Sequence, residues 1–171
     1  MKLKKSRLIL PSIILGSLVF SNTRSFGQKT TTIPDLHVTE IIQGSERDVG
    51  KWGDGHTYII ELWGTWCAPC IKNIPKLTAI QAKYANKGLR VIGYSWEDPD
   101  KVKKFMEKMG EQMKYILVND RDEIFLKEVA EKREMVESFP YTFVIDGIGK
   151  LIWSGNPSNG LETFIDNYYS H

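Results

Sequence analysis

The sequence predicts an α/β fold in which a mixed central β-sheet is flanked by helices on both faces. Two observations lead to this prediction. Apolar, β-branched runs alternate with amphipathic segments along most of the 171 residues, and the last two such runs are joined by a turn sequence with no helix between them. A helix between two strands favours a parallel crossover, whereas a hairpin joins antiparallel strands, so one sheet with both kinds of pairing is expected.

The first half of the chain predicts two strands followed by a helix. Residues 36–42 and 57–63 are apolar and β-branched, and the glycine- and aspartate-rich stretch 50–55 is typical of a turn between them. Apolar residues at helical spacing predict a helix over 68–87, and Gly88 is a suitable C-terminal cap.

The middle of the chain predicts a strand, a helix and a second strand. The strand covers 89–96, and the next helix is expected to begin with Asp98 as N-cap and Pro99 in its first turn. Apolar residues recur at helical spacing over 102–109, and a short strand is expected over 115–118.

The last third predicts a helix, a hairpin and a final helix. Asp120 and Glu123 have the spacing of a capping box for a helix that runs through Val129. Residues 141–146 and 150–155 predict the two strands of a hairpin.

A second capping box, formed by Asn159 and Glu162, is expected to open the C-terminal helix. The apolar positions of that helix are Leu161, Phe164, Ile165 and Tyr168.

Residues 1–27 are predicted to be a signal peptide. A basic start precedes the apolar run Leu8–Phe20, and small residues precede Gln28, where we expect cleavage. The run is shorter than the ~20 residues that span a bilayer, although an uncleaved anchor is the alternative. Residues 28–171 are therefore expected to form one domain outside the cytoplasm, in the periplasm, where disulfides persist.

The charge of the chain argues against nucleic-acid binding. The formal net charge is +2, but five of the 23 basic residues lie in 1–27, which contains no acidic residue. The remaining 144 residues are therefore near −3, and their lysine cluster over 101–108 is typical of a solvated helix face.

The chemistry is predicted at Cys67-Ala68-Pro69-Cys70, which contains the only cysteines of the chain. A C-x-x-C sequence between a strand and a helix is typical of a redox pair. Cys67 at the helix N-terminus would be the more acidic, attacking thiol, because the helix dipole favours its thiolate. Cys70 would lie one turn inside the helix and resolve the mixed disulfide.

Other uses of the two cysteines are less well supported. A purely structural disulfide would close too short a loop to add much stability. Zinc would need two further ligands, and His37, His56 and His171 have no paired spacing. Haem attachment would need a histidine in place of Ile71. No metal and no cofactor are therefore expected.

The stretch from Trp63 to Cys70, WGTWCAPC, resembles the active site of the thioredoxin superfamily, and most closely its TlpA/ResA-like branch of exported bacterial thiol–disulfide oxidoreductases. Pro75 and the pair Phe139-Pro140 match that branch in register. The resemblance covers about residues 34–169 and implies a thioredoxin-like fold with an N-terminal strand extension and a central α/β insertion. Tyr141 departs from the threonine more common in the family, which leaves substrate preference open.

The resemblance also implies roles for residues around the cysteines. Pro140 would follow a cis peptide bond and pack against the disulfide, while Phe139 pairs with a substrate strand; a trans turn proline is the alternative. Trp66, Ala68 and Pro69 would complete the substrate-binding surface.

Two carboxylates and one more tryptophan are further candidates. Glu61, six residues before Cys67, would be a buried proton acceptor for Cys70, unless it points outward on an edge strand. Glu97 is a candidate for tuning the thiols, with a solvated acid before a helix as the alternative. Trp63 would help Trp66 to shield the disulfide, or pack in the core.

These features predict an enzyme that reduces disulfides in exported proteins. The Ala-Pro dipeptide resembles reductive members of the family, and such a reductase implies a membrane electron donor and protein disulfide substrates, with apocytochrome c as a client by analogy. A redox-inert adaptor with the same fold is the alternative. A disulfide-forming oxidase and a peroxiredoxin fit the sequence less well.

Overall fold

The computed structural model describes residues 33–133 and 138–170. The predicted signal peptide, residues 1–27, lies outside the described residues. Six strands form one sheet in the order β1-β4-β3-β2-β5-β6. The strands are β1 (Glu40–Gln43), β2 (Thr57–Leu62), β3 (Leu89–Ser95), β4 (Ile116–Asn119), β5 (Tyr141–Ile145) and β6 (Leu151–Gly155). The helices are α1 (Glu46–Val49), α2 (Ala68–Tyr84), α3 (Pro99–Met109), α4 (Ile124–Arg133) and α5 (Leu161–Tyr168), with 3-10 turns at Ala85–Lys87 and Gly110–Gln112.

The sheet is mixed, as predicted. Strands β2, β3 and β4 are parallel, β1 runs antiparallel to β4, and the β5–β6 hairpin is antiparallel and adjoins β2. The expectation of a parallel crossover at every helix is wrong for α4. This helix connects β4 to β5, which lies on the far side of β3 and β2 and runs antiparallel to them.

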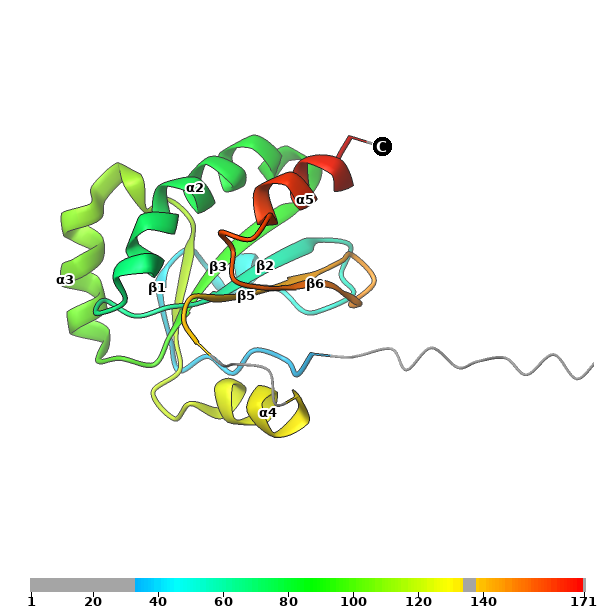
Figure 1. Cartoon of the computed structure of the whole chain (residues 1–171). Helices are drawn as coiled ribbons and strands as arrows, with labels where there is room; N and C mark the ends of the chain where they lie inside the picture. The colour runs from blue at the N-terminus through cyan, green and yellow to red at the C-terminus, as the bar shows by residue number, and fades with distance from the viewer. Residues whose placement is uncertain (1–32, 134–137, 171) are drawn as a thin grey trace, which may run out of the picture.

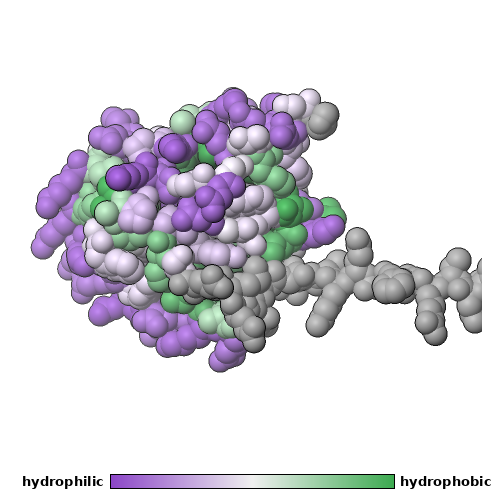
Figure 2. Space-filling model, viewed as in Figure 1, coloured by the Kyte–Doolittle hydropathy of each residue, from purple (hydrophilic) through white to green (hydrophobic). Residues whose placement is uncertain are grey.

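Helices cover both faces of the sheet, which confirms the predicted fold class. Figure 1 shows α2 and α5 on one side of the sheet and α4 on the other. The two faces form separate apolar cores, one packed with Val102 of α3 and residues of α2 and α5, the other with Phe125 and Val129 of α4. In the same view, mostly hydrophilic residues cover the outer sides of α3 and α4 (Figure 2).

Strand β2 lies at the centre of the sheet and is buried along its whole length. Its side chains alternate between the two cores, as the period of a strand requires. Ile59 and Trp63 lie in the core under α2, whereas Ile60 and Leu62 lie in the core under α4. Glu61 therefore belongs to the α2 face.

The N-terminal strand is shorter than expected. Only Glu40–Gln43 pairs with β4, and the preceding residues of the predicted 36–42 strand cross the α4 face instead. Side-chain contacts hold them there: His37 binds Asp120 (2.8 Å), and Trp52 donates to the carbonyl of Pro34 (2.8 Å). The short helix α1 was not predicted.

Of the three predicted N-caps, Asp98 is confirmed, Asp120 is confirmed in part, and the box of Asn159 and Glu162 is wrong. Asp98 accepts from the backbone N–H of Asp100 (2.9 Å) with Pro99 as the first helical residue. Helix α4 begins at Ile124, after Glu123 with φ of 57°, so the predicted box of Asp120 and Glu123 does not form. The Asp120 carboxylate still accepts from the backbone N–H of Phe125 in the first turn of α4 (3.1 Å).

Helix α5 is preceded by Gly160 with φ of 100° and has no side-chain cap, so the predicted box of Asn159 and Glu162 does not form. Within the two described segments, none of the helices combines the length and apolar character needed to cross a membrane.

Candidate active site

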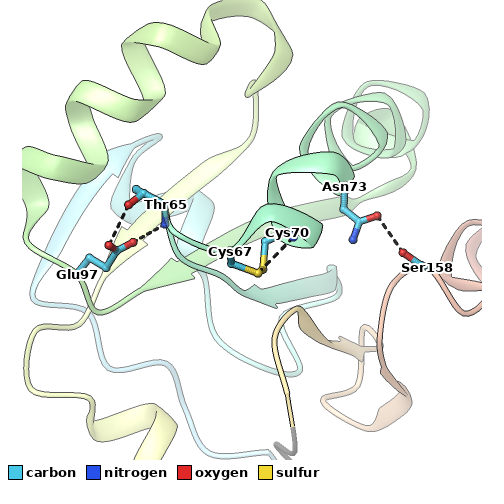
Figure 3. The surroundings of a disulfide bond; sticks show 6 residues. All are labelled: Thr65, Cys67, Cys70, Asn73, Glu97 and Ser158. Carbon is cyan, nitrogen blue, oxygen red and sulfur yellow. Dashed lines mark hydrogen bonds between the residues drawn. A yellow bond between two sulfur atoms is a disulfide. The ribbon is translucent and has the colours of Figure 1, made fainter.

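Cys67 and Cys70 form a disulfide where β2 leads into α2. The S–S distance is 2.01 Å and the Cα atoms lie 5.2 Å apart. Cys67 is the N-cap of α2, and its Sγ accepts from the backbone N–H of Cys70 at 3.3 Å (Figure 3). Cys67 keeps 3% of its surface exposed and Cys70 none, so a partner reaches the first sulfur more easily.

An aromatic rim lies beside the disulfide. Trp66 is 58% exposed, and its ring meets that of Phe139 edge to face with centroids 6.0 Å apart. Phe139 also packs on Trp96, with centroids 4.9 Å apart. Residues Ala68 and Pro69 of the motif are exposed next to this rim.

The peptide bond between Phe139 and Pro140 is cis, which confirms that prediction, and Pro140 is buried. Trp63 is fully buried and packs against Phe105, so it is a core residue and offers no docking surface. The sequence alone had left both possibilities open for Trp63.

Glu97 fastens the loop that precedes Cys67. Its carboxylate accepts from the backbone N–H of Thr65 (2.5 Å) and the Thr65 hydroxyl (3.0 Å) (Figure 3). It also pairs with Lys101. Burial raises the pKa of Glu97, but Lys101 and Thr65 outweigh it and hold the pKa below its usual value. The alternative of a solvated acid is wrong, because only 9% of the side chain is exposed.

Glu61 is fully buried in β2, on the face of the sheet that α2 covers. Neither carboxylate oxygen has a hydrogen-bond partner within the described part of the chain. Burial raises the pKa of Glu61 to about 8, so the carboxyl group is largely protonated at neutral pH. The alternative of an outward-facing glutamate on an edge strand is wrong, because β2 lies between β3 and β5.

Three residues near the site were not singled out from the sequence. Thr65 donates the hydrogen bonds that Glu97 accepts. Gly64 leaves room for the Trp66 indole, because a Cβ at position 64 would lie 2.6 Å from Trp66 Nε1. Asn73, one turn after Cys70, is buried and accepts from the hydroxyl of Ser158 (3.3 Å) (Figure 3). Gly64 and Thr65 lie inside the WGTWCAPC stretch, so the sequence could have pointed to them. The contact between Asn73 and Ser158 joins residues 85 positions apart and has no signal in the sequence.

Metal binding has no support in the geometry of the described residues. No three His, Cys, Asp or Glu side chains gather there in a group that could hold an ion. The disulfide, the aromatic rim and the buried carboxyl group make a site for thiol chemistry.

The sequence from residue 28 to residue 168 matches the Redoxin family. The chain belongs to the Redoxin family. Among curated relatives of this Redoxin, thiol-disulfide oxidoreductase ResA of Geobacillus thermodenitrificans is 27% identical over 161 residues, which cover 86% of each chain. Thiol:disulfide interchange protein DsbE of Xylella fastidiosa is 33% identical over 126 residues, covering 71% of this chain and 55% of that protein.

Solved structures agree on the fold. A thiol:disulfide interchange protein of the thioredoxin family from Chlorobium tepidum superposes with a TM-score of 0.64 at 22% identity, over 82% of this chain and 96% of the other. The predicted thioredoxin-like fold and the TlpA/ResA-like relationship are confirmed. The Cys67–Cys70 pair in this family setting confirms the prediction of an enzyme, a thiol–disulfide oxidoreductase.

Proposed function

We propose that this Redoxin reduces disulfide bonds in exported proteins, with Cys67 as the attacking thiol and Cys70 as the resolving thiol. The observation that carries the proposal is a disulfide at the N-terminus of α2, with an exposed aromatic rim beside it and a fully buried carboxyl group on the same face of the sheet. The exposed aromatic rim can bind the surface of a protein substrate, and a carboxyl group with a pKa of about 8 can accept and release a proton near neutral pH.

The N-terminus of α2 would favour the thiolate of Cys67. The N–H of Cys70 already points at Cys67 Sγ, and the helix dipole adds positive potential at the same place. This thiolate attacks one sulfur of the partner disulfide, forms a mixed disulfide and releases one partner thiolate. Trp66, Ala68, Pro69 and Phe139 would hold the partner during this step, with Pro140 buried behind Phe139.

Glu61 would act in the second step. When its carboxyl group is ionised, it can take the proton of the Cys70 thiol, because both groups lie on the α2 side of the sheet. The Cys70 thiolate then attacks Cys67 Sγ, which releases the second partner thiolate and leaves the Cys67–Cys70 disulfide. Glu97 would support the chemistry indirectly, by holding the loop before Cys67.

A reductase outside the cytoplasm must be reduced again after each cycle. We propose a membrane-bound dithiol carrier as electron donor and exported proteins with unwanted disulfides as clients, apocytochrome c among them. The names of the relatives support thiol–disulfide exchange in general. The signal-peptide pattern of residues 1–27 supports export, with an uncleaved anchor as the alternative.

The reduction potential tests the direction of electron flow. The purified protein is equilibrated with dithiothreitol or glutathione buffers, and the dithiol fraction is counted by alkylation. We expect a value near ~−270 mV, the thioredoxin end of the scale. A value near ~−120 mV would instead show a disulfide-forming oxidase. Failure to equilibrate in either buffer would show a redox-inert adaptor.

The order of the two cysteines has its own test. We expect Cys70→Ser to accumulate mixed disulfides with a protein substrate such as insulin, because Cys67 attacks but nothing resolves the product. Cys67→Ser is the matched control and should form none. Equal trapping by both variants would contradict the assigned order.

A further inference from the structure

Glu61 is one of several buried polar groups on the α2 face that lack a protein partner. The hydroxyl of Tyr115, the indole N–H of Trp63 and the hydroxyl of Thr142 are buried there and make no hydrogen bond to any described residue. Buried polar groups are rarely left unpaired, so a cluster of four needs an explanation.

The sheet register places these groups around Glu61. In β5, Thr142 is the direct partner of Glu61. Trp63 follows Glu61 by two residues and so lies on the same face of the sheet. Tyr115 packs in the same core, two residues before Leu117 of β4. Two of the four groups come from β2 and its extension, one from the neighbouring β5 and one from the residue before β4, on the far side of β3, and all four face the core on the α2 side.

Gly93 brings Tyr115 and Trp63 close to the carboxyl group. It is the β3 partner of Glu61, and a Cβ at this position would lie 3.0 Å from Trp63 Nε1 and 3.0 Å from the Tyr115 ring. Both rings thus occupy the space above Gly93, directly beside Glu61. A larger residue at position 93 would push them away.

The neighbours of Glu61 are donors without a positive charge. The titratable groups in the core of this face are Tyr84 at the end of α2, Tyr115 just before β4, Tyr169 just after α5 and, in the reduced protein, the two cysteines at the start of α2. Among the described residues, burial is the one cause that raises the pKa of Glu61, and no Lys, Arg or His offsets it. An ionised Glu61 would therefore depend on neutral O–H and N–H donors.

We propose that Tyr115, assisted by Trp63 and Thr142, is a positioning residue that donates a hydrogen bond to the Glu61 carboxylate whenever it ionises. A rotation of the Glu61 side chain or one bridging water closes the distance that separates them in the disulfide form. This inference rests on the proposed role of Glu61 in accepting the Cys70 proton. Tyr115 then sets the pH range in which that acceptance occurs.

The test is the pKa of Glu61, read from the carboxyl band in infrared spectra across a pH series and assigned by its loss in Glu61→Gln. A hydrogen bond to a charged group is worth enough to shift a pKa by about one unit. We expect Tyr115→Phe to raise the pKa of Glu61 by about one unit, which lowers the ionised fraction at pH 7 about tenfold. The rate of mixed-disulfide resolution should fall by the same factor.

Tyr94→Phe is the matched control, because Tyr94 is also buried but its hydroxyl binds Asp120 on the opposite face (2.7 Å). It should leave the Glu61 band unchanged. A fluorinated tyrosine at position 115 keeps the ring and strengthens the donor, so it should lower the pKa of Glu61 and provides the test if Tyr115→Phe does not fold.

The outcomes separate the two proposals. An unchanged Glu61 pKa in both Tyr115 variants would overturn the positioning role. A shifted pKa with an unchanged pH profile of resolution would support the positioning role and overturn the proposed role of Glu61 in catalysis.

Discussion

Among the described residues, each face of the sheet buries one carboxyl group, and the two groups differ in their hydrogen bonds. Asp120, under α4, accepts from the Tyr94 hydroxyl (2.7 Å) and the Phe125 N–H (3.1 Å) and contacts the His37 ring (2.8 Å). Glu61, under α2, has no partner within residues 33–133 and 138–170. Both are fully buried, so the difference lies in hydrogen bonding rather than in exposure.

The pKa values follow from this difference. Burial raises the pKa of Asp120, but Tyr94, His37 and the Phe125 N–H outweigh it, so the pKa lies below its usual value. For Glu61, burial acts alone and raises the pKa to about 8. A satisfied carboxylate stabilises the fold, whereas an unsatisfied one costs stability and can exchange a proton near neutral pH. The α2 face is thus the chemical face of the sheet.

The largest expected effect is the pH dependence of stability that Glu61 causes. The native protein keeps the Glu61 proton up to about pH 8, while the unfolded chain releases it near pH 4.5. Because the native state holds this proton more tightly than the unfolded chain, the free energy of unfolding is highest below pH 4.5. It falls by about 4 kcal/mol between pH 4.5 and pH 8. Urea unfolding of the wild type and Glu61→Gln should show this as a difference that changes with pH. A constant difference would contradict it.

The next largest effect is expected from Asp120→Asn. Asparagine keeps one oxygen for the hydrogen bonds from Tyr94 and Phe125, but it lacks the negative charge that strengthens them, and its amide nitrogen would face the His37 ring. We therefore expect a loss of about 3 kcal/mol in the free energy of unfolding at pH 6. Glu61→Gln is the matched variant on the other face and should cost less than about 0.5 kcal/mol at that pH, because it replaces a neutral, unpaired carboxyl group. Equal losses would remove the contrast between the faces.

A smaller loss is expected from Gly93→Ala. The new Cβ would meet Leu117 Cδ2 at 2.9 Å and both Trp63 and Tyr115 at 3.0 Å. Overpacking of this kind costs about 2 kcal/mol, and the displaced rings should also change the pKa of Glu61. Gly110→Ala is the control for the Glu61 pKa: its Cβ meets nothing, so any loss of stability comes from its backbone conformation (φ 53°, ψ −125°) and the pKa of Glu61 should not change. A Glu61 pKa that does not move would argue against the shared space above Gly93.

The smallest expected effect separates the two buried tyrosine hydroxyls. Tyr94→Phe removes a hydrogen bond to Asp120 and should cost about 1 kcal/mol of unfolding free energy at pH 6. Tyr115→Phe removes a hydroxyl without a protein partner and should be neutral within about 0.3 kcal/mol. Comparable losses at pH 6 would indicate that Tyr115 is already hydrogen-bonded when Glu61 is protonated.

Local sequence signals predicted most of the elements. The N-cap of α3 depends on Asp98 and Pro99 alone, and it is confirmed. The predicted capping boxes at Asp120 and Asn159 have the same kind of spacing and do not form. Helix α4 begins four residues after Asp120, whose carboxylate binds the Tyr94 hydroxyl as well as the Phe125 N–H of the first helical turn, and Gly160 with positive φ precedes α5. A side chain predicted to cap a helix can instead bind groups from other parts of the folded chain, and those groups are not visible in the local sequence.

The sequence alone determined the redox pair, its place at a strand–helix junction and the family, because these depend on residues that are neighbours in the chain. Only the tertiary structure decided that Glu61 is buried without a hydrogen-bond partner among the described residues, that Glu97 holds the Thr65 loop and that Tyr115 and Thr142 face the same interior. The physical reason is that burial and hydrogen bonding are set by the order of strands in the sheet. Residues 61, 93, 115 and 142 become neighbours only when that sheet is assembled.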